Sequence, residues 1–133
     1  MFTTSMKKLS LFACFFILLS SFASAQLQEG PEIKLKKVSK DANYGTSPET
    51  AIKVGTVAHE YDYLAMLAGP NGEKITYKRI KSCCPFDCDS APLGTGLLDK
   101  WEITYKGLKK PLIIYLNGYL YKKPKAPKGL SIK

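Results

Sequence analysis

Alternation of apolar and polar residues along the chain predicts several short strands. Trp101, Ile103 and Tyr105 alternate with polar neighbours, which is typical of a strand with one buried face. The other predicted strands follow a similar pattern and span residues 33–38, 51–54, 73–81 and 112–116. We expect these segments to form a mainly antiparallel sheet of about five strands.

Residues 58–68 are the one segment with the spacing of an amphipathic helix. The apolar side chains that would share a face recur at i, i+3, i+4 and i+7 and are Tyr61, Leu64, Ala65 and Ala68. Gly69 suits the position just after a helix, and Pro70 cannot continue one. The predicted fold class is therefore α+β, a small single domain with one helix on the sheet.

Asn117 and Gly118 leave the path of the last strand open. The pair is a strong signal for a two-residue hairpin turn. The alternation also continues beyond it, in which case Gly118 marks a bulge or a close approach of another backbone. Both paths remain predictions at this point.

The first 25 residues have the features of a cleaved signal peptide. Lys7 and Lys8 precede an apolar run, residues 9–19, that is too short to span a bilayer. Residues 23–25 form an A-x-A site, which predicts cleavage before Gln26. An acylated Cys14 or an uncleaved anchor fits the pattern less well. We expect an exported protein located in the periplasm, at the cell surface or in the medium.

Cleavage leaves 108 of the 133 residues, enough for one domain with its own core. We assign residues 26–121 to a single α+β domain and residues 122–133 to a basic Pro/Lys tail, with no transmembrane helix after cleavage. The whole chain has a net charge of +9, and the mature chain +7, because two lysines leave with the signal peptide. Two prolines predict an extended, weakly ordered tail.

The positive charge favours an anionic partner in the envelope or outside the cell. Export argues against nucleic acid as that partner. Tyrosines can stack on flat ligand surfaces, and several lie just before the basic tail. The predicted binding face consists of Tyr115, Tyr119, Tyr121, Lys122 and Lys123.

Three cysteines remain after cleavage, an odd number for an oxidising compartment. Cys88 is expected to pair with either Cys83 or Cys84, because a bond between the two adjacent cysteines would close a strained small ring. That pairing leaves one free thiol. The alternative function is a thiol-redox or metal-binding site in this loop, with His59 or a carboxylate as a further zinc ligand.

No complete catalytic motif occurs in the sequence. His59 is the one histidine, it is expected at the surface, and no nucleophile motif accompanies it. Residues 94–96 lack the third glycine and the following helix of a dinucleotide site. We therefore predict a non-enzymatic binding or structural domain with no catalytic residues, no cofactor and no metal site.

Two motifs, Gly-Pro-Asn-Gly-Glu-Lys at residues 69–74 and Ser-Cys-Cys-Pro-Phe at residues 82–86, give the chain a family resemblance. Together with residues 96–105 and 115–124, they resemble a family of small exported bacterial proteins whose function is not established. Members are often labelled 2-dehydro-3-deoxyphosphooctonate aldolase. That label implies a (β/α)₈ barrel of at least ~200 residues, which the mature chain is too short to form.

Overall fold

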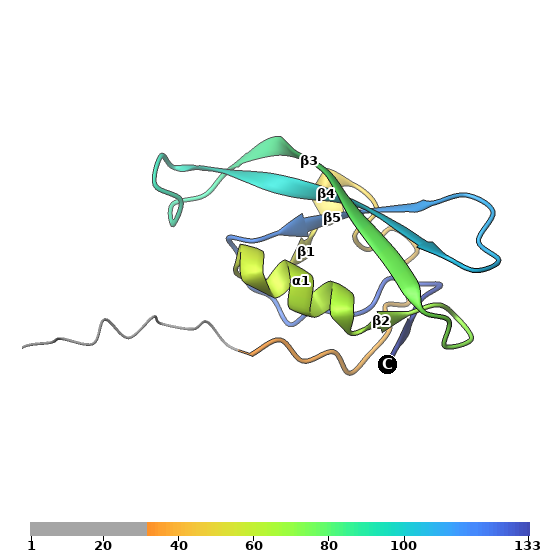
Figure 1. The fold of residues 1–133 in the computed structure, drawn as a ribbon. Coiled ribbons are helices and arrows are strands. Elements are labelled where there is room, and N and C mark those ends of the chain that lie inside the picture. The colour runs from red at the N-terminus through yellow and green to blue at the C-terminus, as the bar shows by residue number, and fades with distance from the viewer. Residues whose placement is uncertain (1–31) are drawn as a thin grey trace, which may run out of the picture.

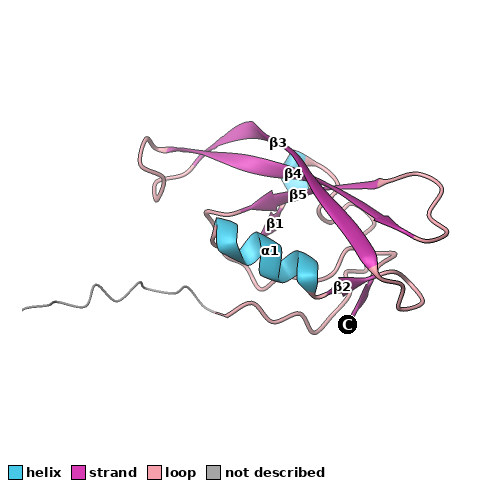
Figure 2. Cartoon of the chain, viewed as in Figure 1, coloured by secondary structure: helices cyan, strands magenta, loops and turns pink. Residues whose placement is uncertain are grey.

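Residues 32–133 are described by a computed structural model and form a small α+β domain (Figures 1 and 2). The predicted signal peptide, residues 1–25, lies outside the described residues. The described part has one α-helix, a mostly antiparallel sheet of four strands and a second sheet of two strands. The predicted fold class is confirmed, and this fold is unrelated to an eight-stranded barrel. No helix within residues 32–133 is long and apolar enough to cross a membrane.

The larger sheet has the strand order β1-β5-β4-β3 and the smaller the order β2-β6. Pairing between β1 and β5 is parallel, and the other strand pairs are antiparallel. In chain order the elements are the 3₁₀ helix η1 Pro48–Thr50, β1 Ile52–Lys53, α1 Val57–Ala65, β2 Leu67–Ala68, β3 Ile75–Asp87, β4 Thr95–Tyr105, β5 Leu112–Asn117 and β6 Ser131–Ile132.

Helix α1 is shorter than predicted and buries a different face. The Thr56 side chain accepts a hydrogen bond from the backbone N–H of His59 and so caps the helix start. The helix ends at Ala65, because the next residues leave it to form β2. Its buried side chains are Glu60, Tyr63 and Leu64. Of the predicted apolar face, Leu64 is buried, whereas Tyr61 and Ala65 are exposed and Ala68 lies beyond the helix in β2.

The hairpin of β3 and β4 is the longest feature of the sheet (Figure 1). The three cysteines were expected in a loop, but β3 runs through Cys83 and Cys84 to Asp87, and only Cys88 lies beyond the strand. Register shifts at Ile80 and at Cys84 each leave an extra residue on β3. β5 pairs with β4 only from Asp99 onward. The part nearest the tip, which we call the outer hairpin (residues 83–87 and 95–98), is therefore two-stranded.

The core lies between α1 and the inner face of the sheet. β4 contributes Trp101 and Ile103, and β5 contributes Ile114 and Leu116. The prediction of a strand at residues 33–38 was wrong, because this segment makes only an isolated bridge at Val38. Its first side chains do alternate between buried and exposed. Ile33 and Leu35 belong to the hydrophobic core, together with Ala126 and Leu130 from the end of the chain.

We refer to residues 122–133 as the C-terminal segment. It contains no helix, but the prediction that it is weakly ordered was wrong. Pro124 and Pro127 are fully buried, and Leu130 joins the core. The backbone of Ala126 bonds on both sides, donating to Lys37 O at 3.0 Å and accepting from Ser39 N at 2.8 Å. Apolar residues between the lysines therefore fix the segment to the domain.

The chain at Asn117 and Gly118 follows neither predicted path in full, because β5 ends at Asn117 and the strand does not continue through Gly118. The Asn117 side chain accepts hydrogen bonds from the N–H groups of Tyr119 and Leu120, at 2.9 and 3.0 Å, and turns the chain. Gly118 does mark a close approach. A Cβ there would lie 3.0 Å from a Glu60 carboxyl oxygen and 3.1 Å from the backbone nitrogen of Val57.

Candidate functional site: a lysine pocket beside the C-terminal segment

Two tyrosine hydroxyls hold the backbone of Lys125. The hydroxyl of Tyr63, a fully buried residue of α1, donates to the Lys125 carbonyl at 2.7 Å. The Lys125 N–H donates in turn to the hydroxyl of Tyr44 at 2.9 Å. Because the backbone N–H and C=O of Lys125 are both held by the domain, the neighbouring lysine side chains start from defined positions.

These lysines line a surface pocket of about 360 Å³, which we call the lysine pocket. This volume lies at the lower end of the roughly 300–1,000 Å³ that small-molecule sites occupy. The lining residues come from three separate parts of the chain and are Ser39, Asp41, Tyr44, Glu49, Thr50, Ala51, Lys53, Lys122, Lys123 and Lys125. Four lysines against two carboxylates make the lining net positive.

The pocket lysines have no ion-pair partner among residues 32–133. The ion pairs of that range join Lys34 to Glu32 and Arg79 to Asp99, both away from the pocket. The backbone N–H of Lys122 donates to the carbonyl of Lys53 at 3.2 Å, so two of the ammonium groups start from adjacent backbone positions. Like charges placed together repel, and a bound anion would relieve that repulsion.

Tyr44 adds a neutral hydrogen-bond donor to the lining. Burial raises the pKa of Tyr44, although the hydrogen bond from the Lys125 backbone opposes that effect. The hydroxyl therefore keeps its proton at neutral pH. Its oxygen accepts from Lys125, which leaves the O–H free to donate to a ligand. Sequence reasoning missed Tyr44, because no local pattern places residue 44 beside residue 125.

The residues of the predicted binding face are divided among different places. Lys122 and Lys123 line the lysine pocket, whereas the tyrosines do not. Tyr115 lies half-buried on β5, with the Lys100 ammonium 5.8 Å from its ring centre. Tyr119 and Tyr121 are partly exposed, and they contact separate neighbours: the Phe86 ring, at 5.8 Å between ring centres, and the backbone bridge at Val54.

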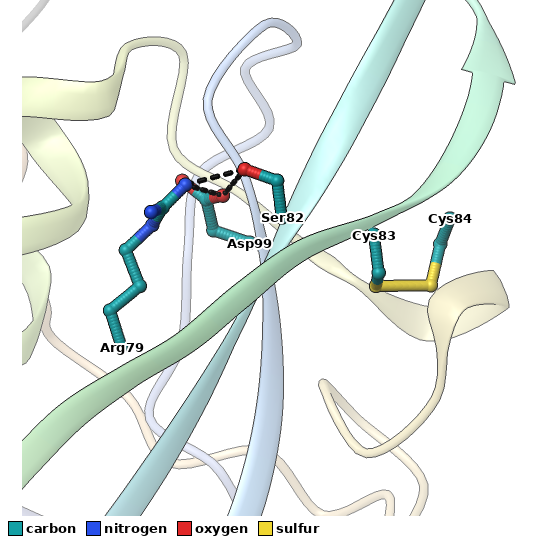
Figure 3. Close-up of a disulfide and its surroundings, with 5 residues drawn as sticks. All are labelled: Arg79, Ser82, Cys83, Cys84 and Asp99. Carbon is teal, nitrogen blue, oxygen red and sulfur yellow. Dashed lines mark hydrogen bonds and ion pairs between the residues drawn. A yellow bond between two sulfur atoms is a disulfide. The ribbon is translucent and has the colours of Figure 1, made fainter.

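The disulfide joins the two adjacent cysteines, a pairing that was predicted to be strained. Cys83 and Cys84 form a disulfide, so the predicted pairing with Cys88 was wrong (Figure 3). Cys84 has a φ of +61°, which lies in the left-handed region, and it is the extra residue of a bulge. That backbone allows the two adjacent sulfurs to meet. Cys88 is a buried free thiol, and its sulfur lies 3.1 Å from the Ser90 hydroxyl.

A carboxyl cluster joins α1 to the sheet, with Glu60, Asp99 and Trp101 buried and Arg79 and Ser82 at its exposed side. Trp101 Nε1 donates to Glu60 at 3.0 Å. Arg79 and Ser82 donate to one Asp99 oxygen at 2.7 and 2.8 Å (Figure 3). No local sequence pattern indicates this cluster, because its members are separated by up to 41 positions.

The two carboxyl groups of this cluster titrate in opposite directions. Burial raises the pKa of Glu60 to about 8, the hydrogen bond from Trp101 opposes the shift, and the Asp99 carboxylate adds to it. Burial also raises the pKa of Asp99, but hydrogen bonds from Arg79, Ser82 and Glu60 outweigh it and leave the value below the ordinary one. At neutral pH, Glu60 therefore holds a proton that it shares with ionised Asp99.

His59 is half-buried, and its Nδ1 lies 2.9 Å from the Val54 carbonyl oxygen, where it supports the start of α1. Within residues 32–133 no three His, Cys, Asp or Glu side chains are grouped in a way that could hold a metal ion.

Comparisons with protein-family models, curated proteins and solved structures found no match to this chain. The lysine pocket is the candidate site because of its volume and the net positive charge of its lining.

Proposed function

We propose that this protein is an exported binding domain whose lysine pocket holds a small anionic group of an envelope or extracellular ligand. The observation that carries the proposal is that four lysines line one pocket: Lys53, Lys122, Lys123 and Lys125. None of them has an ion-pair partner in the described residues. Export follows from the predicted signal peptide at residues 1–25 and is part of the proposal.

The chemical class of the ligand follows from the donors in the pocket. Ammonium groups bind phosphate or carboxylate oxygens through charge-assisted hydrogen bonds. The Tyr44 hydroxyl and the hydroxyls of Ser39 and Thr50 supply neutral hydrogen-bonding groups. Asp41 and Glu49 at the same pocket would repel a highly charged ligand, so a group with one or two negative charges fits best.

Titration of the ¹⁵N-labelled protein with inorganic phosphate, and separately with glucuronate, tests this proposal. Both probes are small enough to enter the pocket, and one of them should shift the amides of Tyr44, Lys53 and residues 122–125 at low ionic strength. Added salt should weaken the binding, because the exposed ammonium groups are screened. Shifts spread evenly over all surface lysines would contradict a defined site.

A charge-matched pair of variants separates the pocket from the overall charge. Lys122→Ala with Lys123→Ala should weaken binding of the active probe by about tenfold or more, which corresponds to the loss of one or two charged hydrogen bonds. Lys106→Ala with Lys109→Ala removes the same charge from an exposed turn outside the pocket and should leave binding unchanged. Equal losses in both variants would rule out the pocket as the binding site.

A further inference from the structure

The Cys83–Cys84 disulfide is accessible from outside the folded core. β3 is the end strand of its sheet, and nothing in residues 32–133 pairs with its outer edge. Both cysteines are half-buried and neither belongs to the hydrophobic core. Ser82 pairs with Asp99, and the sulfurs of Cys83 and Cys84 lie on the other side of the β3 ribbon from the Ser82 side chain (Figure 3). A reductant could therefore reach the sulfurs without opening the core.

The disulfide is coupled to an unfavourable backbone conformation. Cys84 is the one residue other than glycine with a left-handed φ in the described part of the chain. The cost of that conformation for an L-residue shifts an equilibrium by about one order of magnitude. Pro85 restricts its predecessor further towards extended conformations. Opening of the sulfur–sulfur bond would leave Cys84 free to adopt an extended φ.

A change at Cys84 would act on the outer hairpin, whose Phe86 ring contacts Tyr119 in the rest of the domain. Residues 83–87 pair only with residues 95–98, and β5 does not extend that far. A two-stranded segment of this kind is marginally stable by itself. It can therefore rearrange while the four-stranded part of the sheet and the core keep their structure.

We propose that Cys83–Cys84 is a reversible two-electron redox site, and that its reduction rearranges the outer hairpin. The co-reactant is a dithiol, the class of reductant that acts by thiol–disulfide exchange. Its thiolate attacks one sulfur, the Cys83–Cys84 bond breaks, and the released thiolate takes up a proton. The second thiol of the donor then attacks the mixed disulfide. The donor leaves as a disulfide, and both cysteines become thiols.

Cys88 takes no part in this exchange. It is buried, and its sulfur contacts Ser90 inside the loop at the hairpin tip. The two thiols formed by reduction stay on adjacent residues, so an oxidised dithiol can close them again. This redox site is independent of the lysine pocket, and either proposal can fail without the other.

The test treats the folded protein with dithiothreitol, blocks thiols with an alkylating reagent and maps the labels by peptide mass spectrometry. We expect labels on Cys83 and Cys84, none on Cys88, and recovery of the disulfide with oxidised dithiothreitol. Amide exchange of residues 83–87 and 95–98 should become about tenfold faster on reduction, and exchange at core strands should not change.

Two variants and two contrary results complete the design. Cys88→Ser should keep the full cycle, and Cys83→Ser with Cys84→Ser should lose it and show outer-hairpin exchange as fast as in the reduced protein. Labels that appear only at denaturant concentrations that unfold the domain would overturn the redox site. Unchanged exchange in the outer hairpin after full reduction would overturn the rearrangement.

Discussion

Replacement of Glu60 by glutamine is expected to make this protein more stable in mild alkali. The Glu60 carboxyl is buried, accepts a hydrogen bond from Trp101 and shares its proton with Asp99. A glutamine amide has the same shape. Its oxygen can accept from Trp101, and its NH₂ group can donate to Asp99 without holding a titratable proton. Glu60→Gln thus keeps the contacts of the neutral carboxyl group and removes its ionisation.

The size of the effect follows from the difference between the folded and unfolded pKa values. In the folded protein the pKa of Glu60 is about 8, and its ordinary value is 4.5. The stability that this proton contributes is fully present below pH 4.5 and is lost as the pH rises towards 8. At about 1.4 kcal/mol per pKa unit the ceiling is roughly 5 kcal/mol. Local relaxation and entry of water around an ionised Glu60 make the actual penalty smaller than this ceiling, so we expect about 2 kcal/mol.

Urea unfolding of both proteins at pH 5 and at pH 8.5 measures this effect. The free energies of unfolding should be close at pH 5, and Glu60→Gln should be more stable by about 2 kcal/mol at pH 8.5. Asp62→Asn is the control, because it removes a carboxylate from an exposed position of the same helix. A stability difference for Glu60→Gln that is the same at both pH values would refute the assignment of a buried proton to Glu60.

Two further substitutions test the packing that supports the pocket and the core. Tyr63→Phe removes the donor to the Lys125 carbonyl and should cost about 1–2 kcal/mol in urea unfolding and weaken anion binding, whereas Tyr61→Phe, at an exposed position, should do neither. Leu116→Ala removes a fully buried side chain of β5 and should cost about 2–5 kcal/mol, against less than ~0.5 kcal/mol for Leu93→Ala at the exposed hairpin tip. Equal effects within either pair would contradict the burial described above.

Sequence patterns predicted those parts of the fold that depend on local periodicity. Trp101 and Ile103 alternate with polar residues, and β4 buries them as that period requires. The pattern failed at α1, where Glu60 takes a buried position that an apolar residue normally fills. Its partners lie on distant β4, so no window around residue 60 contains the reason for its burial.

The cysteine pairing depended on a backbone conformation that residue types do not reveal. A non-glycine residue with a positive φ is uncommon, and a proline after it makes that conformation less expected still. Both conditions hold at Cys84, where the β-bulge sets the backbone. Reasoning from the ordinary geometry of disulfides therefore favoured the more distant Cys88, which is instead buried in its own small loop.

Burial of the C-terminal segment gives the proposed anion site an ordered backbone. Lysines in a mobile tail would attract anions over a broad volume and pay the full entropic cost of ordering on binding. Pro124, Ala126 and Pro127 are buried between and beside the lysines, so the domain has already ordered the backbone that supports them. The free energy for that ordering comes from folding. A ligand in the lysine pocket then has only side chains to immobilise, and this preorganisation favours one defined anion site over diffuse attraction by charge.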